Sequence, residues 1–590
     1  MPVAAPAPLP VRIEPTEPAV WTRTLALGLV GSLLCYLAHP PVGVGLLAWI
    51  GPATWLFLAR LPRMPGRRPY LALWIAGAAY WLAAIQWIRL PHWANIFGLF
   101  LLAGYLGAYL PLFMGLVRVA VHRIRVPLWI AGPVVWTGFE WARARLLSGF
   151  LMASLAHTQV EFPTVIQIAD TLGEYGVTFL IMLVAASIAE AIYAIIIHSP
   201  SEPGRPRPRS PRHMARMLLK LAPAALALAA ALAYGRFRLT ERIVYLESPE
   251  KPTATIALIQ CDMLADWKGT EARDIAVNRQ MVELSRDAQR ASPRPISLHV
   301  WPETMYRTPL LQAEGSYRPP PKFFAGDMDA VFAYTPKQLG ALARELDAGL
   351  LTGLDRVHWR RPSPDAAVDP EDAASYYDRF NAAACFDRTG QLAGTYDKMH
   401  LLPFGEYIPL VGWFPFLAGY SPLTGSASPG KLPDPIVVDN VHYSVNICYE
   451  TVLPHVIRKQ FVHLTAEAGC PPDVLVNLTN DAWYWGSSEL DMHLASGMFR
   501  AIEMRTPLVI AANRGLSGHI DRLGRVVAVS ERDVPAYVLV EVELPPRQGN
   551  FRSLFAAYGD WFALVCLVCC VVPAAAAWRG RRAGKMTKLE

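Results

Sequence analysis

The sequence predicts a bundle of membrane helices joined to a large α/β domain outside the membrane. Hydrophobic residues make up 53% of the 590 residues and charged residues only 17%, which is little charge for a soluble protein of this size. The hydrophobic excess lies in residues 23–243 and in a short stretch near the C-terminus. Residues 244–550 have the composition of an ordinary globular domain and are numerous enough to bury a core.

Eight apolar segments are candidates for membrane-spanning helices, each of which needs about 20 mostly apolar residues. Seven come before the α/β domain and one follows it, at 23–39, 42–60, 70–90, 96–121, 126–147, 176–198, 217–237 and 554–578. The first two flank a short turn at 39–41, which predicts a tight hairpin that crosses the membrane only partly. Residues 1–22 are a poor match to a cleavable signal peptide, so we expect the first apolar segment to be retained.

Positive charge alternates between the loops that join these segments. The loops after the second, fourth and sixth segments and the C-terminal tail are rich in Lys and Arg, whereas the loops after the first, third and fifth are nearly free of them. Cytoplasmic loops carry such an excess, so we expect both termini in the cytoplasm and the α/β domain on the outer face. The expected parts are a cytoplasmic segment (1–22), a transmembrane bundle (23–243), a periplasmic domain (244–550), and a C-terminal transmembrane helix with a cytoplasmic tail (551–590).

Several function classes find no support in the sequence. The net charge of +7 fits the cytoplasmic loops, and no basic patch with interleaved aromatic residues indicates nucleic-acid binding. Four of the eight cysteines lie in or near apolar segments, and the other four are widely spaced without a CxxC pair, so neither a zinc site nor a disulfide framework is indicated. No P-loop or cluster of His and Cys ligands is present, and we expect no cofactor and no metal.

Ionisable residues inside an apolar segment are costly and tend to be functional or paired. The segment 126–147 carries Glu140, Arg143 and Arg145. The favoured interpretation is an ion pair between Glu140 and Arg143, which are three residues apart on a helix. A functional role in the membrane is the alternative.

Residues 244–550 alternate between strand-like and helix-like runs, which predicts an α/β fold with covered sheets. Strands are expected at 254–260, 296–301, 350–353, 382–386, 443–447, 474–478, 508–512 and 537–542, and helices at 275–291, 336–348 and 488–505. Two segments interrupt this pattern, at 305–330 and 358–378, and are predicted to be loops. The first follows Glu303 directly and is a candidate lid.

Three short motifs carry residues with useful chemistry. They are Val300-Trp301-Pro302-Glu303, the run from Tyr396 to Tyr407 with Lys398 and Glu406, and Val445-Asn446-Ile447-Cys448-Tyr449-Glu450. Alone, each has an ordinary explanation, because a cysteine that ends a strand is usually a small buried residue and a charged loop residue is usually solvated. All three nevertheless fit strand ends or the loops beyond them, where open α/β sheets place their sites.

The three residue types form a sufficient set for acyl transfer through a thioester. The thiolate, not the thiol, is the nucleophile, and a carboxylate can act as the general base that takes the thiol proton. An ammonium group can stabilise the thiolate and then the oxyanion of the tetrahedral intermediate. Glu303, Lys398 and Cys448 are therefore the candidate catalytic residues.

These motifs resemble the Glu-Lys-Cys signature of the nitrilase, or carbon–nitrogen hydrolase, superfamily. With apolar helices on both sides, the chain is similar to the membrane branch formed by the apolipoprotein N-acyltransferase family. The resemblance extends over most of the chain and includes Phe139-Glu140-Trp141, Gln167-Ile168-Ala169-Asp170, the segment from Gly173 to Leu180, Pro403-Phe404-Gly405-Glu406-Tyr407-Ile408-Pro409, Asn480-Asp481-Ala482-Trp483 and Arg500-Ala501-Ile502-Glu503.

The resemblance implies an αββα sandwich on a bundle of about eight helices. It implies Glu303 as general base, Cys448 as the residue that accepts the acyl chain, and Lys398 with the backbone N–H of Tyr449 as oxyanion donors. The residues implied or expected to support the triad or bind substrate are Glu406, Tyr449, Glu450, Asn381 and Trp301. The implied donor is a phospholipid of the membrane, and the implied acceptor is the α-amino group of diacylglyceryl-cysteine on an apolipoprotein, at a bacterial inner membrane.

The sequence departs from the family pattern at three short motifs, and the segments 305–330 and 358–378 are also long for the family. Tyr484-Trp485-Gly486 has an additional aromatic residue, Arg514 stands where a small polar residue is usual, and Ala382 follows Asn381. Two other functions were weighed: a membrane-tethered hydrolase with the same triad, and a scaffold with a decayed catalytic domain, which the intact triad disfavours. His400 and His493 are expected to be structural.

Overall fold

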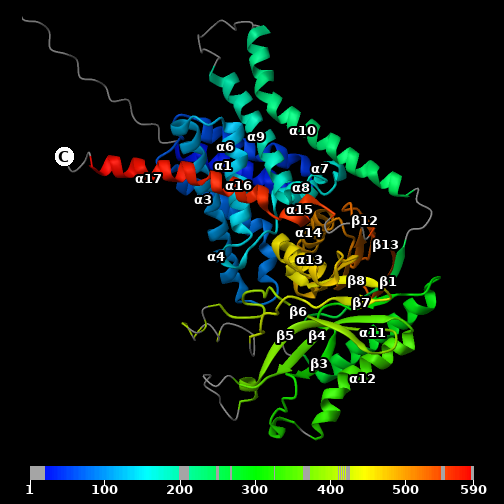
Figure 1. The fold of residues 1–590 in the computed structure, drawn as a ribbon. Helices are drawn as coiled ribbons and strands as arrows, with labels where there is room; N and C mark the ends of the chain where they lie inside the picture. Colours follow the sequence, from blue (N-terminus) through cyan, green and yellow to red (C-terminus); the bar gives the residue numbers. More distant parts are fainter. Residues whose placement is uncertain are drawn as a thin grey trace, which may run out of the picture.

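The computed structural model contains a helical bundle and a two-sheet domain that pack against each other (Figure 1). The structure describes residues 20–197, 211–246, 252–265, 269–324, 326–362, 372–409, 411, 413–414, 416, 419, 426–546 and 552–586. Most of the expected N-terminal segment 1–22, the arginine-rich stretch at 205–209 and part of the expected loop 358–378 lie outside these residues.

The bundle is built from helices at both ends of the chain. Its longer helices are α1 (Val20–Ala38), α2 (Gly51–Arg60), α3 (Pro69–Ala84), α4 (Asn95–Gly107), α5 (Tyr109–Val119), α6 (Leu128–Arg143), α9 (Glu174–Ile197), α10 (Pro211–Leu246), α16 (Trp561–Cys569) and α17 (Val571–Met586). The short helices are η1 (Gly45–Trp49), η2 (Gln86–Arg89), η3 (Ala120–Ile124), η4 (Leu146–Ser148), η5 (Leu155–Gln159), α7 (Pro163–Ile166), α8 (Ala169–Leu172) and α15 (Leu554–Tyr558).

Fewer of these helices are long enough to span a membrane than the sequence predicted. Among the described residues, four helical stretches have the necessary length and hydropathy, at Asn95–Ile124, Glu174–Ile196, Leu219–Thr240 and Trp561–Trp578. Arg23–Ala38 and Pro69–Ala84 are apolar but shorter. The predicted span at 42–60 is divided into η1 and α2, because Pro52 lacks a backbone N–H and starts a new helix.

The α/β domain contains two sheets. In the first, the strand order is β13-β1-β2-β4-β5-β6, and β3 pairs with β4. Its strands are β1 (Thr253–Gln260), β2 (Leu298–Val300), β3 (Tyr306–Ala313), β4 (Gly349–Trp359), β5 (Tyr377–Phe386), β6 (Leu392–Asp397) and β13 (Ala536–Glu543). The second has the order β12-β11-β10-β9-β8-β7. Its strands are β7 (Ile436–Val438), β8 (Val441–Ile447), β9 (Val474–Asn480), β10 (Leu508–Asn513), β11 (Gly518–Ile520) and β12 (Val526–Val529).

The sheets pack face to face, and helices cover their outer faces. Buried residues of both sheets, such as Val300 and Val476, form one apolar core between them. Helices α11 (Glu271–Ala291) and α12 (Met328–Leu346) cover the first sheet, and α13 (Pro454–Ala468) and α14 (Glu489–Met504) cover the second. Where only one face of a strand is covered, buried and more exposed residues alternate, because successive side chains point to opposite faces of the sheet. The expected αββα sandwich is confirmed.

Several elements differ from the prediction. The segment 305–330 is not a simple loop, because it contains the strand β3, the short helix η6 (Pro321–Phe323) and the start of α12. Pro309 obscured this strand, and it is accommodated where the pairing of β3 with β4 shifts register. The prediction also missed β6, β7, β11, β12 and α13. Most of these strands are short, and their residues do not alternate clearly between apolar and polar.

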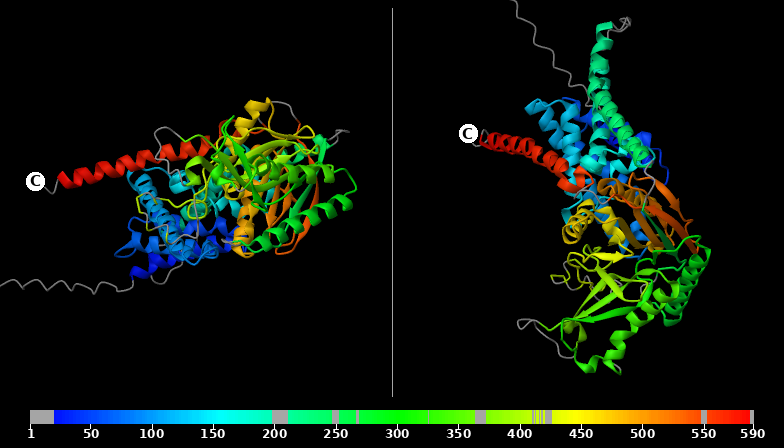
Figure 2. Two further views of the ribbon diagram at one scale, coloured as in Figure 1. Left: turned by 90° about the horizontal axis from the view of Figure 1, so that it is seen from below. Right: turned by 45° about the vertical axis from the view of Figure 1, so that its right-hand side comes forward.

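The bundle contacts the domain through the α13–α14 layer, opposite α11 and α12 (Figure 1, Figure 2). Asp170 of α8 binds Arg505, which follows α14, at 2.6 Å, and Arg238 of α10 at 2.8 Å. One turn earlier in α14, Arg500 binds Glu174 of α9 at 2.9 Å, and both side chains are completely buried. These ion pairs join the two parts of the chain.

We expect Asp170→Asn to destabilise the protein strongly, because it leaves Arg505 and Arg238 without their shared anion. Removing one partner of a buried ion pair costs about 3–5 kcal/mol. Asp287→Asn is the matched control, because Asp287 pairs with Arg290 at the surface and such pairs contribute about 1 kcal/mol or less. Thermal unfolding in detergent measures both variants. Equal shifts for the two would contradict this account.

Candidate active site

The three predicted catalytic residues come together at the ends of strands. Glu303 follows β2, Lys398 follows β6, and Cys448 follows β8 as the first residue of η9 (Cys448–Val452). The Lys398 ammonium lies 3.4 Å from a Glu303 carboxylate oxygen. The charges of Glu303 and Lys398 both act on the Cys448 thiol. The ends of strands from two facing sheets thus converge on one site, as the motif positions predicted.

The backbone at the site is shaped to present these side chains. Cys448 has φ = 53° and Thr304, next to Glu303, has φ = 57°, both in the left-handed region that non-glycine residues rarely adopt. Gly353 of β4 lies against the Glu303 backbone, where an added Cβ would be 2.6 Å from the Glu303 Cα. Gly353 therefore permits the close approach that brings the general base to the strand end.

A network of carboxylates and amides holds the charged groups of the triad. Asn381 of β5 donates to Glu303 at 2.7 Å and to Glu406 at 2.6 Å. Lys398 donates to Glu406 at 3.0 Å, and the backbone N–H of Asn480 donates to the other oxygen of Glu303 at 3.1 Å. The ammonium is thus shared by two carboxylates that one amide group keeps in place.

The electrostatics favour a charged lysine and a neutral thiol in the resting site. Burial lowers the pKa of Lys398, but the charges of Glu406 and Glu303 outweigh it and hold the pKa well above its usual value. Burial, and then the charge of Glu303, raises the pKa of the Cys448 thiol well above its usual value, although Lys398 opposes the shift. The thiol therefore needs a base at the moment of attack, and Glu303 is the adjacent one.

Glu450 ties the cysteine turn to the lysine loop. Its carboxylate accepts hydrogen bonds from the backbone N–H of Ile447 at 2.8 Å, of Met399 at 2.8 Å and of His400 at 2.9 Å. Both of its oxygens also accept from the Tyr396 hydroxyl, at 2.8 and 2.7 Å. Burial raises the pKa of Glu450 to about 6, although the hydrogen bond from Ile447 opposes the shift. Glu450 is therefore a positioning residue.

Tyr449 connects the site to the bundle. Its hydroxyl donates to the backbone oxygen of Gly149 at 3.1 Å, and its ring stacks on Phe150 with centroids 6.5 Å apart. His400 contacts Ser148 in the same loop at 3.2 Å. This contact agrees with a structural role for His400.

Trp301 lies away from the reacting groups. Its side chain is completely buried in the core between the first sheet and its helices, and its indole N–H donates to Ser285 of α11 at 2.9 Å. Its position supports the strand that leads to Glu303, which agrees with the supporting role, one of the two roles expected for it. The sequence suggested a place near the site because Trp301 is close to Glu303 in the chain. Residues near a strand end can face opposite sides of the sheet, and Trp301 faces the helices that cover the first sheet.

Residues outside the three motifs also shape the site. His493 of α14 donates to the backbone oxygen of Cys448 at 3.1 Å, and Asn477 of β9 donates to the same oxygen at 3.2 Å. The sequence analysis assigned no site role to Asn477. A polar side chain inside an apolar strand was the available signal, because such a group needs a buried partner.

Two of the three short motifs that depart from the family pattern have ordinary structural explanations. Tyr484 packs edge-to-face on Trp87 of η2, with ring centroids 5.2 Å apart, so the additional aromatic segment touches the bundle. Arg514 forms ion pairs with Asp262 and Asp533, at 2.9 and 2.8 Å. Nothing in the structure explains why Ala382 replaces a hydroxyl-bearing residue.

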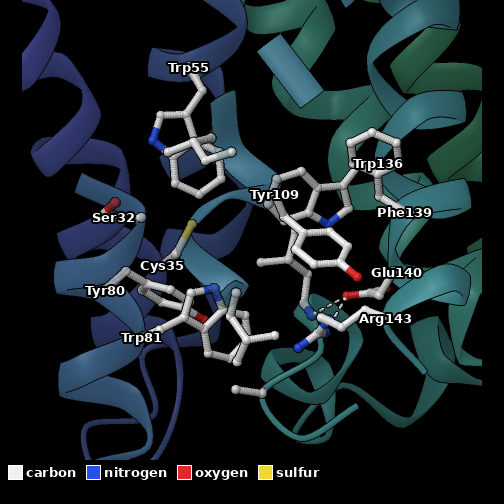
Figure 3. A pocket seen from close by; sticks show the side chains of 15 residues that line it. Ser32, Cys35, Trp55, Tyr80, Trp81, Tyr109, Trp136, Phe139, Glu140 and Arg143 are labelled. Atoms are coloured by element: carbon white, nitrogen blue, oxygen red, sulfur yellow. Dashed lines mark hydrogen bonds and ion pairs between the residues drawn. The ribbon is translucent and has the colours of Figure 1, made fainter. Parts of the chain in front are cut away.

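A small cavity of about 40 Å³ lies inside the bundle (Figure 3). Its walls are mainly aromatic and aliphatic and include Tyr80, Trp81, Trp136 and Phe139. The expected ion pair between Arg143 and Glu140 is present at its edge, with a distance of 3.2 Å.

An apolar path leads from this cavity to the triad. Trp81, in the cavity wall, packs edge-to-face on Phe150, with centroids 6.1 Å apart, and Phe150 stacks on Tyr449. Trp81, Tyr449 and Cys448 belong to one hydrophobic cluster. The nucleophile therefore adjoins apolar surface that continues into the bundle.

We expect Glu450→Gln to impair both folding and the chemistry. An amide has one acceptor oxygen in place of two and would turn an NH₂ toward N–H donors, so buried donors lose their partner at a cost of about 1–3 kcal/mol. A displaced Lys398 loop would slow acylation of Cys448 by about 10- to 100-fold. Glu467→Gln, on the exposed face of α13, is the control. Wild-type unfolding temperature and acylation rate in Glu450→Gln would refute the positioning role.

Comparisons with known proteins cover nearly the whole chain. Residues 31–187 match the model described as the apolipoprotein N-acyltransferase N-terminal domain, and residues 255–546 match the carbon–nitrogen hydrolase model. The apolipoprotein N-acyltransferase of Rhodopirellula baltica is 29% identical over 90% of this chain and 93% of its own length. A carbon–nitrogen hydrolase structure from Helicobacter pylori covers 49% of this chain and 89% of its own, at 16% identity and a TM-score of 0.33.

The match of highest identity among these comes from Geobacter metallireducens. Its apolipoprotein N-acyltransferase is 30% identical to this chain over 576 residues, which are 96% of this chain and 97% of the relative. Since the identity extends through both the bundle and the two-sheet domain, the chain belongs to the apolipoprotein N-acyltransferase family.

Proposed function

We propose that this enzyme transfers a fatty acyl chain from a phospholipid to the α-amino group of diacylglyceryl-cysteine on apolipoproteins, through a thioester on Cys448. The observation that carries the proposal is the position of the triad. Cys448 adjoins charged groups on one side and, on the other, an apolar cluster that continues into the bundle. Such a site can hold a polar reacting centre and a lipid tail together.

In the first half-reaction, Cys448 attacks the ester carbonyl of the phospholipid. The thiol proton passes to Glu303 as the S–C bond forms, and the Lys398 ammonium stabilises the oxyanion. The backbone N–H of Tyr449 is a second candidate donor, because the first N–H groups of a helix such as η9 lack partners within the helix. The tetrahedral intermediate then collapses and the ester C–O bond breaks. Glu303 returns the proton to the oxygen of the departing lysophospholipid.

In the second half-reaction, the α-amino group of the acceptor attacks the thioester. The N–C bond forms, the C–S bond breaks, and a proton from nitrogen passes through Glu303 to the Cys448 thiolate. The amide product leaves and the free thiol is restored. Donor and acceptor use the same triad in turn, which predicts ping-pong kinetics.

We place the triad on the outer side of a bacterial inner membrane. Alternation of Lys and Arg between loops supports a bundle of about eight crossings with both termini in the cytoplasm, the shorter helices included. The domain at 244–550 would then be periplasmic. This side suits the reaction, because both substrates are lipid-anchored and approach from the bilayer.

Incubation of the purified enzyme with phospholipid tests the thioester. We expect a fatty-acyl adduct on Cys448 by mass spectrometry, released by hydroxylamine or by a diacylated lipopeptide, and no adduct in Cys448→Ala. The adduct should persist in water until an amine is added. Rapid loss to water alone would favour the hydrolase, and an adduct on another residue would contradict the mechanism.

The bundle cavity predicts acyl-chain selectivity, since its mainly aromatic and aliphatic lining gives the end of the thioester's chain apolar surroundings. Leu110 lines the cavity, and Leu110→Trp should shift acylation toward shorter chains by about tenfold, because each methylene without apolar surroundings forfeits about 0.8 kcal/mol. Leu101→Trp is the control, because Leu101 is 76% exposed on the bundle surface. Competition between short- and long-chain phospholipids measures the ratio, and an unchanged ratio would place the chain elsewhere.

A further inference from the structure

A second group of ionisable residues lies beside the nucleophile and has no part in the mechanism above. Asp481 belongs to η10 (Asp481–Tyr484), which directly follows β9, and Glu489 and His493 belong to α14. All three side chains are buried. Glu489 and His493 are four residues apart, so they lie on the same face of α14. This face is the one turned toward Cys448, because His493 donates to the Cys448 backbone oxygen at 3.1 Å.

Two of these residues have partners that fix their positions. The second ring nitrogen of His493 lies 3.9 Å from Asp481, and Asp481 also accepts a hydrogen bond from Thr479 at 2.7 Å. Burial lowers the pKa of His493, but its interactions with Asp481 and Glu489 outweigh this, and the net pKa is raised. His493 therefore holds Asp481 and the backbone of Cys448 together.

Glu489 is different, because one of its carboxylate oxygens is buried without a hydrogen-bond partner in the part of the chain that the structure describes. A buried, unpaired carboxylate oxygen is costly and calls for a partner. The ionisable groups that interact with Glu489 are Asp481 and Tyr484 of η10, Cys448 of η9, and His493 and Asp491 of its own helix. Asp491 has a cation of its own in Arg532.

The charge of this group is suited to a cation. Asp481 and Glu489 add two acidic groups beside the thiol, and His493 is already engaged by Asp481 and Cys448. Acidic residues attract and orient a positively charged ligand in a site from which water is excluded. The unpartnered oxygen of Glu489 supplies the hydrogen-bond acceptor that a primary ammonium group requires.

We propose that Glu489, with Asp481, forms the subsite that binds the primary ammonium group of the acceptor before its transfer. The inference rests on the proposed function and adds a residue that determines acceptor recognition. The ammonium of a phospholipid headgroup has the same chemistry. The acceptor is the better fit, because its nitrogen must come within about 3–3.5 Å of the acyl carbon on Cys448, whereas a headgroup ammonium is separated from the reacting ester by the phosphate and glycerol.

The protonation of Glu489 matches this task. Burial, and then the charge of Asp481, raises its pKa to about 8, close to the value of about 7.7–8.0 for a free α-amino group. The raised pKa makes the Glu489 carboxylate a stronger proton acceptor for the bound ammonium than an ordinary carboxylate would be. The neutral amine that results is the nucleophile.

The test separates the two half-reactions in Glu489→Gln, which keeps the shape of the side chain and removes its charge. We expect normal acylation of Cys448 by phospholipid. Above about pH 8, where Glu489 is largely ionised, the KM for the diacylated lipopeptide should rise about 10- to 100-fold, since a charge-assisted hydrogen bond is lost. Failure of acylation in the wild-type enzyme would instead refute the proposed function. Asp491→Asn, on the same helix but paired with Arg532, is the control and should behave as wild type.

A competitor of fixed charge distinguishes recognition from a general structural defect. A diacylated lipopeptide with a trimethylated α-nitrogen is permanently cationic and cannot be acylated. Because Glu489 ionises as the pH rises, this competitor should bind the wild-type enzyme more tightly up to about pH 8 and then level off. The N-acetylated lipopeptide, which is neutral, should show no such rise, and neither competitor should show it with Glu489→Gln.

Two outcomes would overturn the proposal. One is a Glu489→Gln enzyme whose KM for the lipopeptide and preference for the cationic competitor equal those of the wild type. The other is slower Cys448 acylation of this variant by phosphatidylethanolamine but not by phosphatidylglycerol, which would assign the subsite to the headgroup of the donor.

Discussion

The active site depends on one buried ammonium group that two carboxylates share. Lys398 lies between Glu303 and Glu406, and Asn381 binds both acids. A buried charge is tolerated only when it is paired and hydrogen-bonded, so these four side chains stabilise one another or fail together. The same arrangement separates two tasks. The neighbouring carboxylates hold the pKa of Lys398 well above its usual value, and burial raises that of the Cys448 thiol. In the proposed mechanism the ammonium therefore serves the oxyanion, and the thiol stays neutral until Glu303 takes its proton.

The positions of these groups depend on how distant strand ends are tied together. The Glu450 carboxylate accepts hydrogen bonds from backbone N–H groups of the cysteine turn and of the loop after Lys398. It therefore joins the two sheets at the site. Cys448 holds a left-handed backbone conformation there. Such strain persists only where surrounding contacts over-determine it, and His493 and Asn477, which both bind the Cys448 oxygen, supply those contacts.

The bundle is part of the site and more than an anchor. Helix α14 carries His493 at one turn and Arg500 further along, so the helix that supports the cysteine is also held by Glu174 of the bundle. Phe150 and Trp81 extend the apolar surroundings of Tyr449 into the bundle cavity. The geometry of the site and the docking of the two domains therefore rest on one continuous set of contacts, which the proposed function also uses to admit a lipid chain.

The sequence by itself determined the division into bundle and α/β domain and the αββα class, and it predicted the triad Glu303, Lys398 and Cys448, whose members the structure brings together. These follow from local signals: apolar runs, alternation of element types, and short motifs at strand ends. The sequence predicted more long apolar helices than the four found among the described residues, and Pro309 obscured the strand β3. It named Trp301 as a supporting or substrate-binding residue, and the structure places Trp301 in the core behind the strand that leads to Glu303. It assigned no role to Asn477 or Glu489. Only the tertiary structure decided those points, because the partners of a buried polar group come from residues far apart in the chain. For Glu489, what matters is the absence of a partner among the described residues, and no local pattern records that.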